Sequence, residues 1–166
     1  MKLKKRRINM EVYGKVFRKY SNGELNIINK SYNPDTEKYH EVILEMKSSG
    51  YKQVIINSEL MLKLLNEIIL NEGFILQIKF TDNTDENLII DVNNLIGKIR
   101  YDRIQFIKLK EVLNWALDNN SIDIFNVELL YKQKKYTVYS NGLILGEEIN
   151  VLFEEILKKI FFEYLS

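Results

Sequence analysis

Two acids and a lysine in the first third of the chain have a spacing that could support cleavage of a phosphodiester bond. Asp35 is followed, after nine intervening residues, by Glu45, Met46 and Lys47. In metal-dependent hydrolysis two carboxylates hold the metal ion, and a lysine can lie beside the attacking water. Glu45 and Lys47 would then have to share one side of a strand. Their neighbours are spaced for a helix, on which the two side chains project about 200° apart, so we expect no nuclease site.

The other residues capable of chemistry favour structural roles. His40 is the only histidine, and its place beside the apolar stripe of a predicted helix favours a partly buried or surface role over catalysis. A calcium loop needs a fixed spacing of acids and a glycine at its bend, which the acids Asp82, Asp85, Glu86 and Asp91 do not have. The sequence also lacks the glycine-rich phosphate motifs and the Gly-x-Ser-x-Gly motif. We therefore expect no enzyme activity, no metal and no cofactor.

The basic start of the chain is the strongest candidate for a binding surface. The predicted partner-binding residues are Lys2, Lys4, Lys5, Arg6, Arg7, Lys15, Arg18, Lys19 and Tyr20. Aromatic residues among cations can stack on bases, and a second basic group, Lys132, Lys134 and Lys135, stands beside Tyr136 and Tyr139. Two interpretations stay open: contact with a nucleic acid or a protein, or a solubilising arm beside an edge strand that lysines protect.

Composition limits the class of protein. The 166 residues fit a single domain. The net charge of +1 hides an asymmetry, because residues 1–60 carry 12 Lys and Arg against 7 Asp and Glu, whereas residues 61–166 carry 12 against 16. The absence of cysteine excludes disulfides and thiolate metal sites and favours the cytoplasm. No apolar run approaches the roughly 20 residues that span a membrane, so we expect no membrane insertion.

Apolar periodicity in the first half predicts a β-hairpin followed by two helices. Asn22-Gly23 between two alternating runs is a strong signal for the hairpin turn. Asp35 or Thr36 is expected to cap the first helix, and Ser58 the second. The predicted elements are strands around 10–16 and 25–27, a helix that ends before Gly50, a buried strand at 51–57 and a helix that ends before Gly73.

The second half is predicted to contain further hairpins and two more helices. Leu88, Ile90 and Val92 alternate after a polar turn, which indicates a strand that returns along the one before it. The predicted elements are strands at 74–80 and 88–92, an extended segment at 99–107, a helix at 109–116, strands at 125–131 and 136–139 separated by a turn at Lys134-Lys135, and a C-terminal helix from near Glu147. Two helix–strand–turn–strand units are thus expected, which is typical either of an αββ internal repeat or of two unrelated units.

These elements predict an α+β fold, with a mainly antiparallel sheet built from hairpins and packed against about four helices. No linker rich in Pro, Gly or Ser interrupts the chain. Residues 1–166 are therefore expected to form one domain with a short basic N-terminal arm at residues 1–7.

The C-terminal helix carries more apolar side chains than one buried face uses. Val151 and Phe162 lie off the face predicted for the core, and on an uninterrupted α-helix they would project within about 20° of each other. Burial of a large apolar side chain contributes roughly 1.5–3 kcal/mol, and two-fold dimers are the commonest soluble assemblies. We hypothesise a weak homodimer through Val151 and Phe162, with a monomer as the alternative.

The functional expectation follows from what is absent and from the charge asymmetry. Abundant Ile, Asn and Lys with a single Pro indicate an AT-rich genome. A cysteine-free α+β chain without catalytic residues is, in a bacterium or phage, typical of inhibitors, immunity proteins and adaptors. We predict a non-catalytic protein-binding module of the cytoplasm that occludes a surface of its partner. The alternative is an RNA- or DNA-binding protein that uses the basic N-terminal third, whose binding would fall steeply with salt.

Deletion of residues 1–7 should leave the melting temperature nearly unchanged and weaken partner binding. The segment is dense in charge and lacks apolar periodicity, so it contributes little to a core. Thermal unfolding of the full-length and truncated chains measures the first effect. A drop of many degrees on truncation would instead show that the arm contributes to the folded domain.

Overall fold

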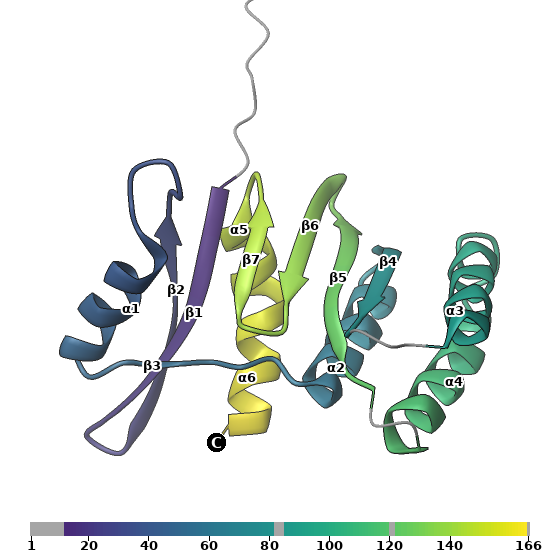
Figure 1. The fold of residues 1–166 in the computed structure, drawn as a ribbon, viewed down its shortest axis with the longest axis horizontal. Helices are drawn as coiled ribbons and strands as arrows, with labels where there is room; N and C mark the ends of the chain where they lie inside the picture. Colours follow the sequence, from purple (N-terminus) through teal and green to yellow (C-terminus); the bar gives the residue numbers. More distant parts are fainter. Residues whose placement is uncertain (1–11, 82–84, 120–121, 166) are drawn as a thin grey trace, which may run out of the picture.

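The structure is a computed structural model that describes residues 12–81, 85–119 and 122–165. The described strands form one sheet in which every pair is antiparallel, in the order β2-β1-β7-β6-β5-β4, with β3 also paired to β1 (Figure 1). The strands are β1 Val12–Ser21, β2 Glu24–Tyr32, β3 Lys52–Gln53, β4 Phe74–Phe80, β5 Ile124–Tyr131, β6 Lys134–Tyr139 and β7 Leu143–Gly146. The predicted α+β fold with a mainly antiparallel sheet is confirmed.

Five helices accompany the sheet in the described part of the chain. They are α1 Tyr39–Ser48, α2 Ser58–Leu70, α3 Glu86–Ile99, α4 Gln105–Asn119 and a C-terminal helix made of α5 Ile149–Leu152, the π-helical segment η1 Phe153–Leu157 and α6 Lys158–Leu165. Helix α2 and the C-terminal helix contribute to the larger core, to which α3 and α4 add at the end of the sheet near β4. None of the described helices has the length and apolar character needed to cross a membrane.

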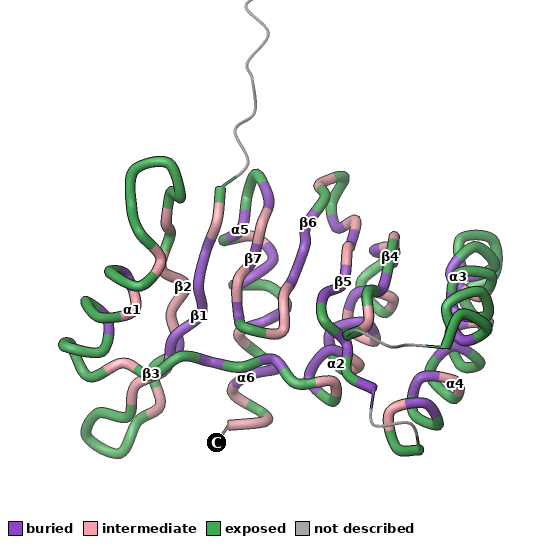
Figure 2. Tube along the Cα trace, in the orientation of Figure 1, coloured by how far each residue is buried: buried purple, intermediate pink, exposed green. Residues whose placement is uncertain are grey.

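Strand β1 is buried on both faces, and this divides the interior into two cores. Val16 belongs to the larger core, whereas the next residue, Phe17, packs with Val42 and Met46 of α1 in a smaller one. Successive side chains of a strand point to opposite faces, so α1 covers the face of β1 opposite the larger core. Figure 2 shows the central part of β1 as buried, in contrast to the exposed outer surfaces of α1, α3 and α4.

The first hairpin forms as predicted. Asn22 and Gly23 both have positive φ, 54° and 77°, as a two-residue turn that matches the twist of the strands requires. The later hairpin differs from the prediction, because its turn lies at Lys132 and Gln133, two residues before the expected Lys134-Lys135, which instead begins β6.

The caps of the first two helices differ from the sequence-based expectation. Helix α1 begins after Lys38, which makes no side-chain capping bond, so neither Asp35 nor Thr36 is the cap. Helix α2 is capped by Asn57, whose side-chain oxygen accepts a hydrogen bond from the Leu60 amide at 2.9 Å. Asparagine and serine cap helices about equally well, and the neighbouring residues alone did not distinguish Asn57 from Ser58.

Residues 86–99 form helix α3, so the predicted strand at 88–92 is wrong. Leu88, Val92, Ile96 and Ile99 are the buried residues of this helix and follow its period, whereas Ile90 is exposed. The alternation of three apolar residues was therefore a short-range coincidence inside a longer helical pattern. Asp85 caps the helix by accepting a hydrogen bond from the Asn87 amide at 2.9 Å.

The predicted extended segment at 99–107 is also absent, because α3 ends at Ile99 and α4 begins at Gln105. Helices α3 and α4, which connect β4 to β5 in the sequence, pack against each other as a helical hairpin at one end of the molecule in Figure 1. The first predicted αββ unit is therefore helix–strand–helix, and the two units do not share one arrangement of elements.

The segment after α1 runs beside β1 and the turn between β6 and β7. Only Lys52 and Gln53 pair as a strand, but the Val54 amide donates to the Val16 carbonyl at 3.1 Å and the Ile56 amide to the Ser140 carbonyl at 2.8 Å. The Val54 carbonyl lies so close to Gly142, which has a φ of 83°, that a Cβ there would collide with it. Glycine is the residue that satisfies both conditions.

The C-terminal helix begins at Ile149, close to the expected start, and contains a π-helical segment in its middle. Its buried residues are Ile149, Leu152, Phe153, Ile156, Leu157, Ile160 and Phe161, which repeat every four residues. On an α-helix four residues turn about 400°, so the stripe would rotate by about 40° per repeat. A π segment takes up one extra residue, and this keeps the stripe directed at the core.

Candidate functional site

The predicted basic surface is only partly present among the described residues. Lys2, Lys4, Lys5, Arg6 and Arg7 lie outside the described residues. Lys15 is in the interior, although the sequence suggested that it belongs to the binding surface. Arg18, Lys19 and Tyr20 lie near the end of β1, where Lys19 points to the side of α1 and Tyr20 to the side of the C-terminal helix, so the structure does not bring the predicted residues onto one surface.

Lys15 is fully buried, with 0% of its surface exposed. Its Nζ lies 6.0 Å from the centre of the Tyr39 ring of α1 and has no hydrogen-bond partner among the described residues. The strand register places Lys30 and Leu143 beside it. Burial disfavours the charged form and lowers the pKa of the Lys15 ammonium to about 8.

A buried amine with a lowered pKa is one kind of candidate for function, but Lys15 is not presented to a ligand. A nearby cavity of about 250 Å³ is lined by Tyr13, Tyr32 and the turn at 33–35, and not by Lys15. The ring of Tyr32 lies between those of Tyr13 and Tyr39, at centroid distances of 5.7 and 6.0 Å. Burial, with a smaller contribution from Tyr32, raises the pKa of Tyr39.

The remaining hairpin residues have structural contacts of their own. The Lys19 ammonium donates to the Ser49 carbonyl at the end of α1, at 2.8 Å, and the Tyr20 hydroxyl donates to the Leu165 carbonyl at 2.6 Å. A cation at the C-terminal end of a helix interacts favourably with its free carbonyls. Arg18 has no hydrogen bond or ion pair with the described part of the chain and is the cation of this group that remains available.

Each lysine of the later hairpin is next to an acid. Lys132 lies 2.7 Å from Glu155, Lys134 lies 3.3 Å from Glu148, and Lys135 lies 3.4 Å from Glu128. Exposed pairs of this kind contribute little to stability, but they neutralise the charge that the sequence suggested for a second basic group. Of its two tyrosines, Tyr136 is fully buried.

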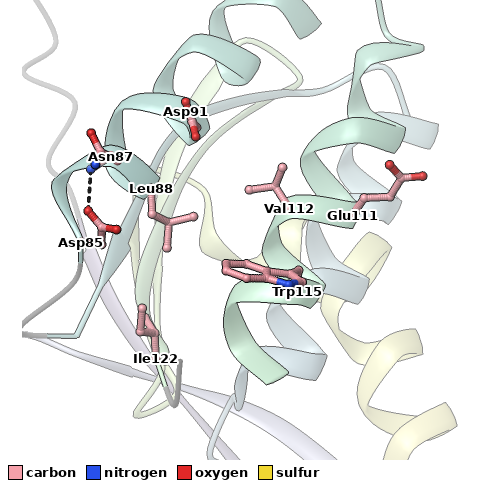
Figure 3. A pocket seen from close by; sticks show the side chains of 8 residues that line it. All are labelled: Asp85, Asn87, Leu88, Asp91, Glu111, Val112, Trp115 and Ile122. Atoms are coloured by element: carbon pink, nitrogen blue, oxygen red, sulfur yellow. Dashed lines mark hydrogen bonds between the residues drawn. The ribbon is translucent and has the colours of Figure 1, made fainter. Parts of the chain in front are cut away.

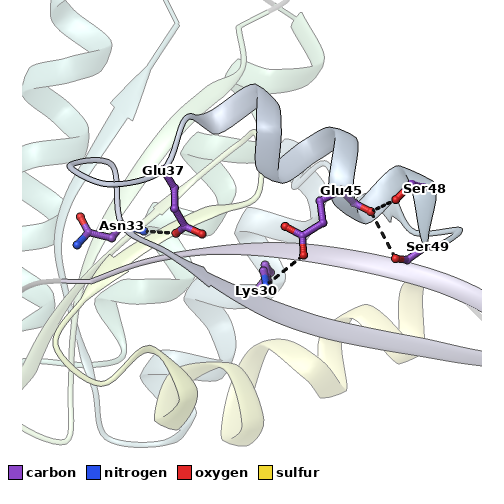
Figure 4. A network of polar contacts seen from close by, with 6 residues as sticks. All are labelled: Lys30, Asn33, Glu37, Glu45, Ser48 and Ser49. Carbon is purple, nitrogen blue, oxygen red and sulfur yellow. Dashed lines mark hydrogen bonds and ion pairs between the residues drawn. The ribbon is translucent and has the colours of Figure 1, made fainter.

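The acid–lysine pattern does not assemble a metal site. Glu45 lies on α1, where its carboxylate is 3.8 Å from the Lys30 ammonium and its carbonyl accepts hydrogen bonds from Ser48 and Ser49 (Figure 4). Asp35 belongs to the turn before the helix. In that turn, the Glu37 carboxylate accepts a hydrogen bond from the Asn33 amide at 2.9 Å.

The other candidate residues for chemistry are on the surface or in helix caps. His40 is exposed on α1. Asp85 caps α3, Glu86 and Asp91 lie on its first turns, and Asp82 is outside the described residues. Among the residues that the structure places, no three histidine or acidic side chains are close enough to hold a metal ion.

A groove of about 770 Å³ between α3 and α4 was not anticipated from the sequence. Its lining consists of Asp85, Asn87, Leu88, Asp91, Glu111, Val112, Trp115 and Ile122. Figure 3 shows Val112 and Trp115 projecting from α4 toward α3, where Leu88 and Asp91 face them, while Glu111 points away on the other side of α4. Trp115 is the only tryptophan of the chain, and 62% of it is exposed.

The helical hairpin also concentrates exposed apolar side chains. Six of the twelve large apolar residues that are exposed in the described structure belong to α3, α4 and their connection: Ile89, Ile90, Tyr101, Ile104, Ile107 and Trp115. Single exposed apolar residues are normal on protein surfaces, and large contiguous apolar patches are the ones typical of interaction sites. Two features of the sequence could have revealed this surface: the helical period of residues 86–99, and the single tryptophan, Trp115, on the next helix.

Val151 and Phe162, the predicted dimer residues, are each half-buried and pack against the larger core. The π segment lies between them. Because it adds one residue, the 11-residue separation corresponds to about 10 α-helical steps, and the two side chains project about 80° apart instead of about 20°. Val151 and Phe162 therefore do not form the single patch on which the dimer was predicted, and the dimer itself stays a hypothesis.

Replacement of Lys15 by Met should raise stability and remove a pH dependence. The pKa of Lys15 is about 8 in the folded protein and 10.5 for the free side chain, so between these values the unfolded chain binds more protons and stability rises with pH. Above about pH 10 the raised pKa values of Tyr131 and Tyr136, both about 12 through burial, reverse the slope. Chemical unfolding from pH 7 to 10 should show the rise in the natural chain and a gain on the order of 2–3 kcal/mol at pH 7 in Lys15→Met.

The matched control is Lys52→Met, which removes an exposed lysine of β3 and should keep the rise. A Lys15→Met chain that still gains stability from pH 8 to 10 would show that another group is responsible.

The homodimer is tested by light scattering over a concentration series. A dimer through the C-terminal helix predicts a mass that increases from 19.8 kDa toward twice that value, and Phe162→Glu should suppress the increase while melting still shows a folded domain. A mass that stays at the monomer value at every concentration contradicts the hypothesis.

The comparisons with known proteins identify no relative. No protein-family model, no curated protein and no solved structure matches the chain.

Proposed function

We propose that the chain is a non-catalytic protein-binding module, of the inhibitor, immunity or adaptor kind found in bacteria and phages, that acts in the cytoplasm by covering a surface of its partner. The supporting observation is the concentration of exposed apolar side chains on the α3–α4 hairpin, with Trp115 at the groove. Tryptophan is enriched among the residues that dominate binding energy at protein interfaces.

The position of the hairpin suits this function. Helices α3 and α4 lie beside the edge strand β4, at one end of the sheet (Figure 1). A partner that docks there would meet side chains held by two packed helices, so binding would require little ordering of this surface. Occlusion needs only a rigid, complementary surface, and no reactive group is required.

The second candidate, a nucleic-acid-binding protein, receives less support from the geometry. Lys15 is buried, Lys19 is bonded to the Ser49 carbonyl and Lys30 lies beside Glu45. Phosphate contacts depend on available Lys and Arg side chains, and Arg18 is the one left on this hairpin among the described residues. Nucleic-acid binding through this hairpin would therefore rely on Arg18 and on the residues before Val12.

Retention of a partner by the immobilised chain tests the proposal. A lysate of the organism that encodes the chain is applied with and without nuclease treatment. We expect a protein whose retention survives the nuclease and is lost with Trp115→Ala, because truncation of a central interface aromatic typically costs 2 kcal/mol or more, about thirtyfold in affinity.

Ile55→Ala is the matched control, since Ile55 is equally exposed, at 60%, but lies on the segment after β3. This variant should retain the partner. Retention that disappears after nuclease treatment would contradict the proposal and favour nucleic-acid binding.

A further inference from the structure

The groove between α3 and α4 combines an apolar floor with an acidic rim. Leu88 and Ile122 form buried parts of its lining, and Val112 and Trp115 extend this apolar surface outward. Asp85 and Asp91 are exposed carboxylates of the same lining, and Glu111 adds a third exposed carboxylate, which points away from α3 on the outer side of α4 (Figure 3). An occupant must therefore offer apolar groups for the floor and suit negative charge at the rim.

The rim carboxylates are not neutralised by the protein itself. None of Asp85, Asp91 and Glu111 forms an ion pair with a described residue, and the described residues of the lining include no lysine or arginine. Asp85 uses one oxygen to cap α3. The positive end of the α3 dipole, equivalent to about half a charge, is small against the two carboxylates of Asp85 and Asp91, so the groove keeps a negative potential.

The apolar surface continues beyond the groove along α4. At about 100° per residue, Ile104, Ile107 and Trp115 fall within an arc of about 80° on one side of the helix, together with Glu111. The stripe from Ile104 to Trp115 is about 16 Å long at 1.5 Å per residue. A compact small molecule in the groove would leave Ile104 and Ile107 uncovered, whereas an extended or helical segment would cover the whole stripe.

One cation lies about 20° outside this arc. Lys108 is exposed and stands one turn before Val112, but it is not part of the groove lining. A segment that approaches the stripe therefore meets Lys108 and Glu111 on α4 and the two carboxylates of Asp85 and Asp91 at the groove. This balance disfavours nucleic acids and other phosphate-bearing ligands, which the rim would repel.

We propose that this groove binds a cationic, amphipathic segment of the partner protein. This inference rests on the proposed function and adds the chemistry of the partner. Apolar side chains of the segment would pack on Leu88, Val112 and Trp115, and its lysines or arginines would pair with Asp91 and Glu111. Amphipathic helices bind grooves in this way, with anchors spaced at i, i+3 or i+4, and i+7.

A direct test uses Trp115 as the reporter, because it is the only tryptophan. The full-length chain is titrated with a synthetic peptide of roughly 14 residues that places Leu at helical spacing and Lys elsewhere. The matched peptide replaces every Lys by Glu. We expect a saturable shift of tryptophan emission to shorter wavelength with the Lys peptide, at least tenfold tighter binding than with the Glu peptide, and weaker binding at about 0.5 M salt.

A charge-reversed variant tests the rim. Asp91→Lys combined with Glu111→Lys should weaken binding of the Lys peptide at least tenfold and favour the Glu peptide, because like charges face each other across an interface at a large cost. Asp85 is left in place because it caps α3. The control combines Glu24→Lys and Glu41→Lys, which make the same charge change at exposed positions of β2 and α1, and should keep the preference for the Lys peptide. Circular dichroism confirms that both variants fold.

Three results would overturn the inference: equal affinity for the two peptides, an unchanged preference in the Asp91→Lys, Glu111→Lys variant, or tighter binding of a peptide of residues 1–10 than of the Lys peptide. The last would assign the groove to the basic arm of the chain itself. Failure of the proposed function is distinguishable, since the lysate would then yield no nuclease-resistant partner even if the Lys peptide binds. Conversely, a partner retained equally by the natural and charge-reversed chains would leave the proposed function standing and refute the groove as its site.

Discussion

The fold depends on the burial of β1 on both faces and along both edges. Val16 and Phe17 point into different cores, β2 pairs along one edge, and β7 and β3 share the other. The central part of this strand, from Gly14 to Phe17, has no surface left for a partner. This is why Lys15, which alternates onto the face under α1, ends up inside the protein with a lowered pKa despite belonging to a basic sequence.

The parts of the fold that local signals determine could be predicted from the sequence. The two-residue hairpin turn requires positive φ at both positions, which Asn22 and Gly23 adopt. The apolar stripe of α2 repeats over enough turns to exclude a strand. The assignment failed at α3, where Leu88, Ile90 and Val92 alternate within a helix whose buried face extends to Ile99. The groove could not be predicted for the same reason, because it exists only where α3 packs on α4.

The charge distribution along the sequence does not describe the charge available for binding. Two cations predicted for the binding surface, Lys15 and Lys19, are buried or hydrogen-bonded, and the lysines of the later hairpin lie beside acids. The carboxylates at the α3–α4 groove have no such partners among the described residues. A sequence with a basic start thus folds with a groove that combines apolar and acidic side chains, and the cationic segment proposed for this groove has the opposite charge to the partner that the basic start suggested.

The π segment of the C-terminal helix has a consequence for the two ends of the domain. One additional residue before Lys158 rotates everything that follows by about 100° relative to an uninterrupted α-helix. In this orientation the Tyr164 hydroxyl accepts a hydrogen bond from the Asn57 side chain at 2.9 Å, and the Leu165 carbonyl accepts one from the Tyr20 hydroxyl at 2.6 Å. A single inserted residue therefore determines the direction in which Tyr164 and the end of the last helix face, and so allows the hydrogen bonds to the first hairpin and to the start of α2.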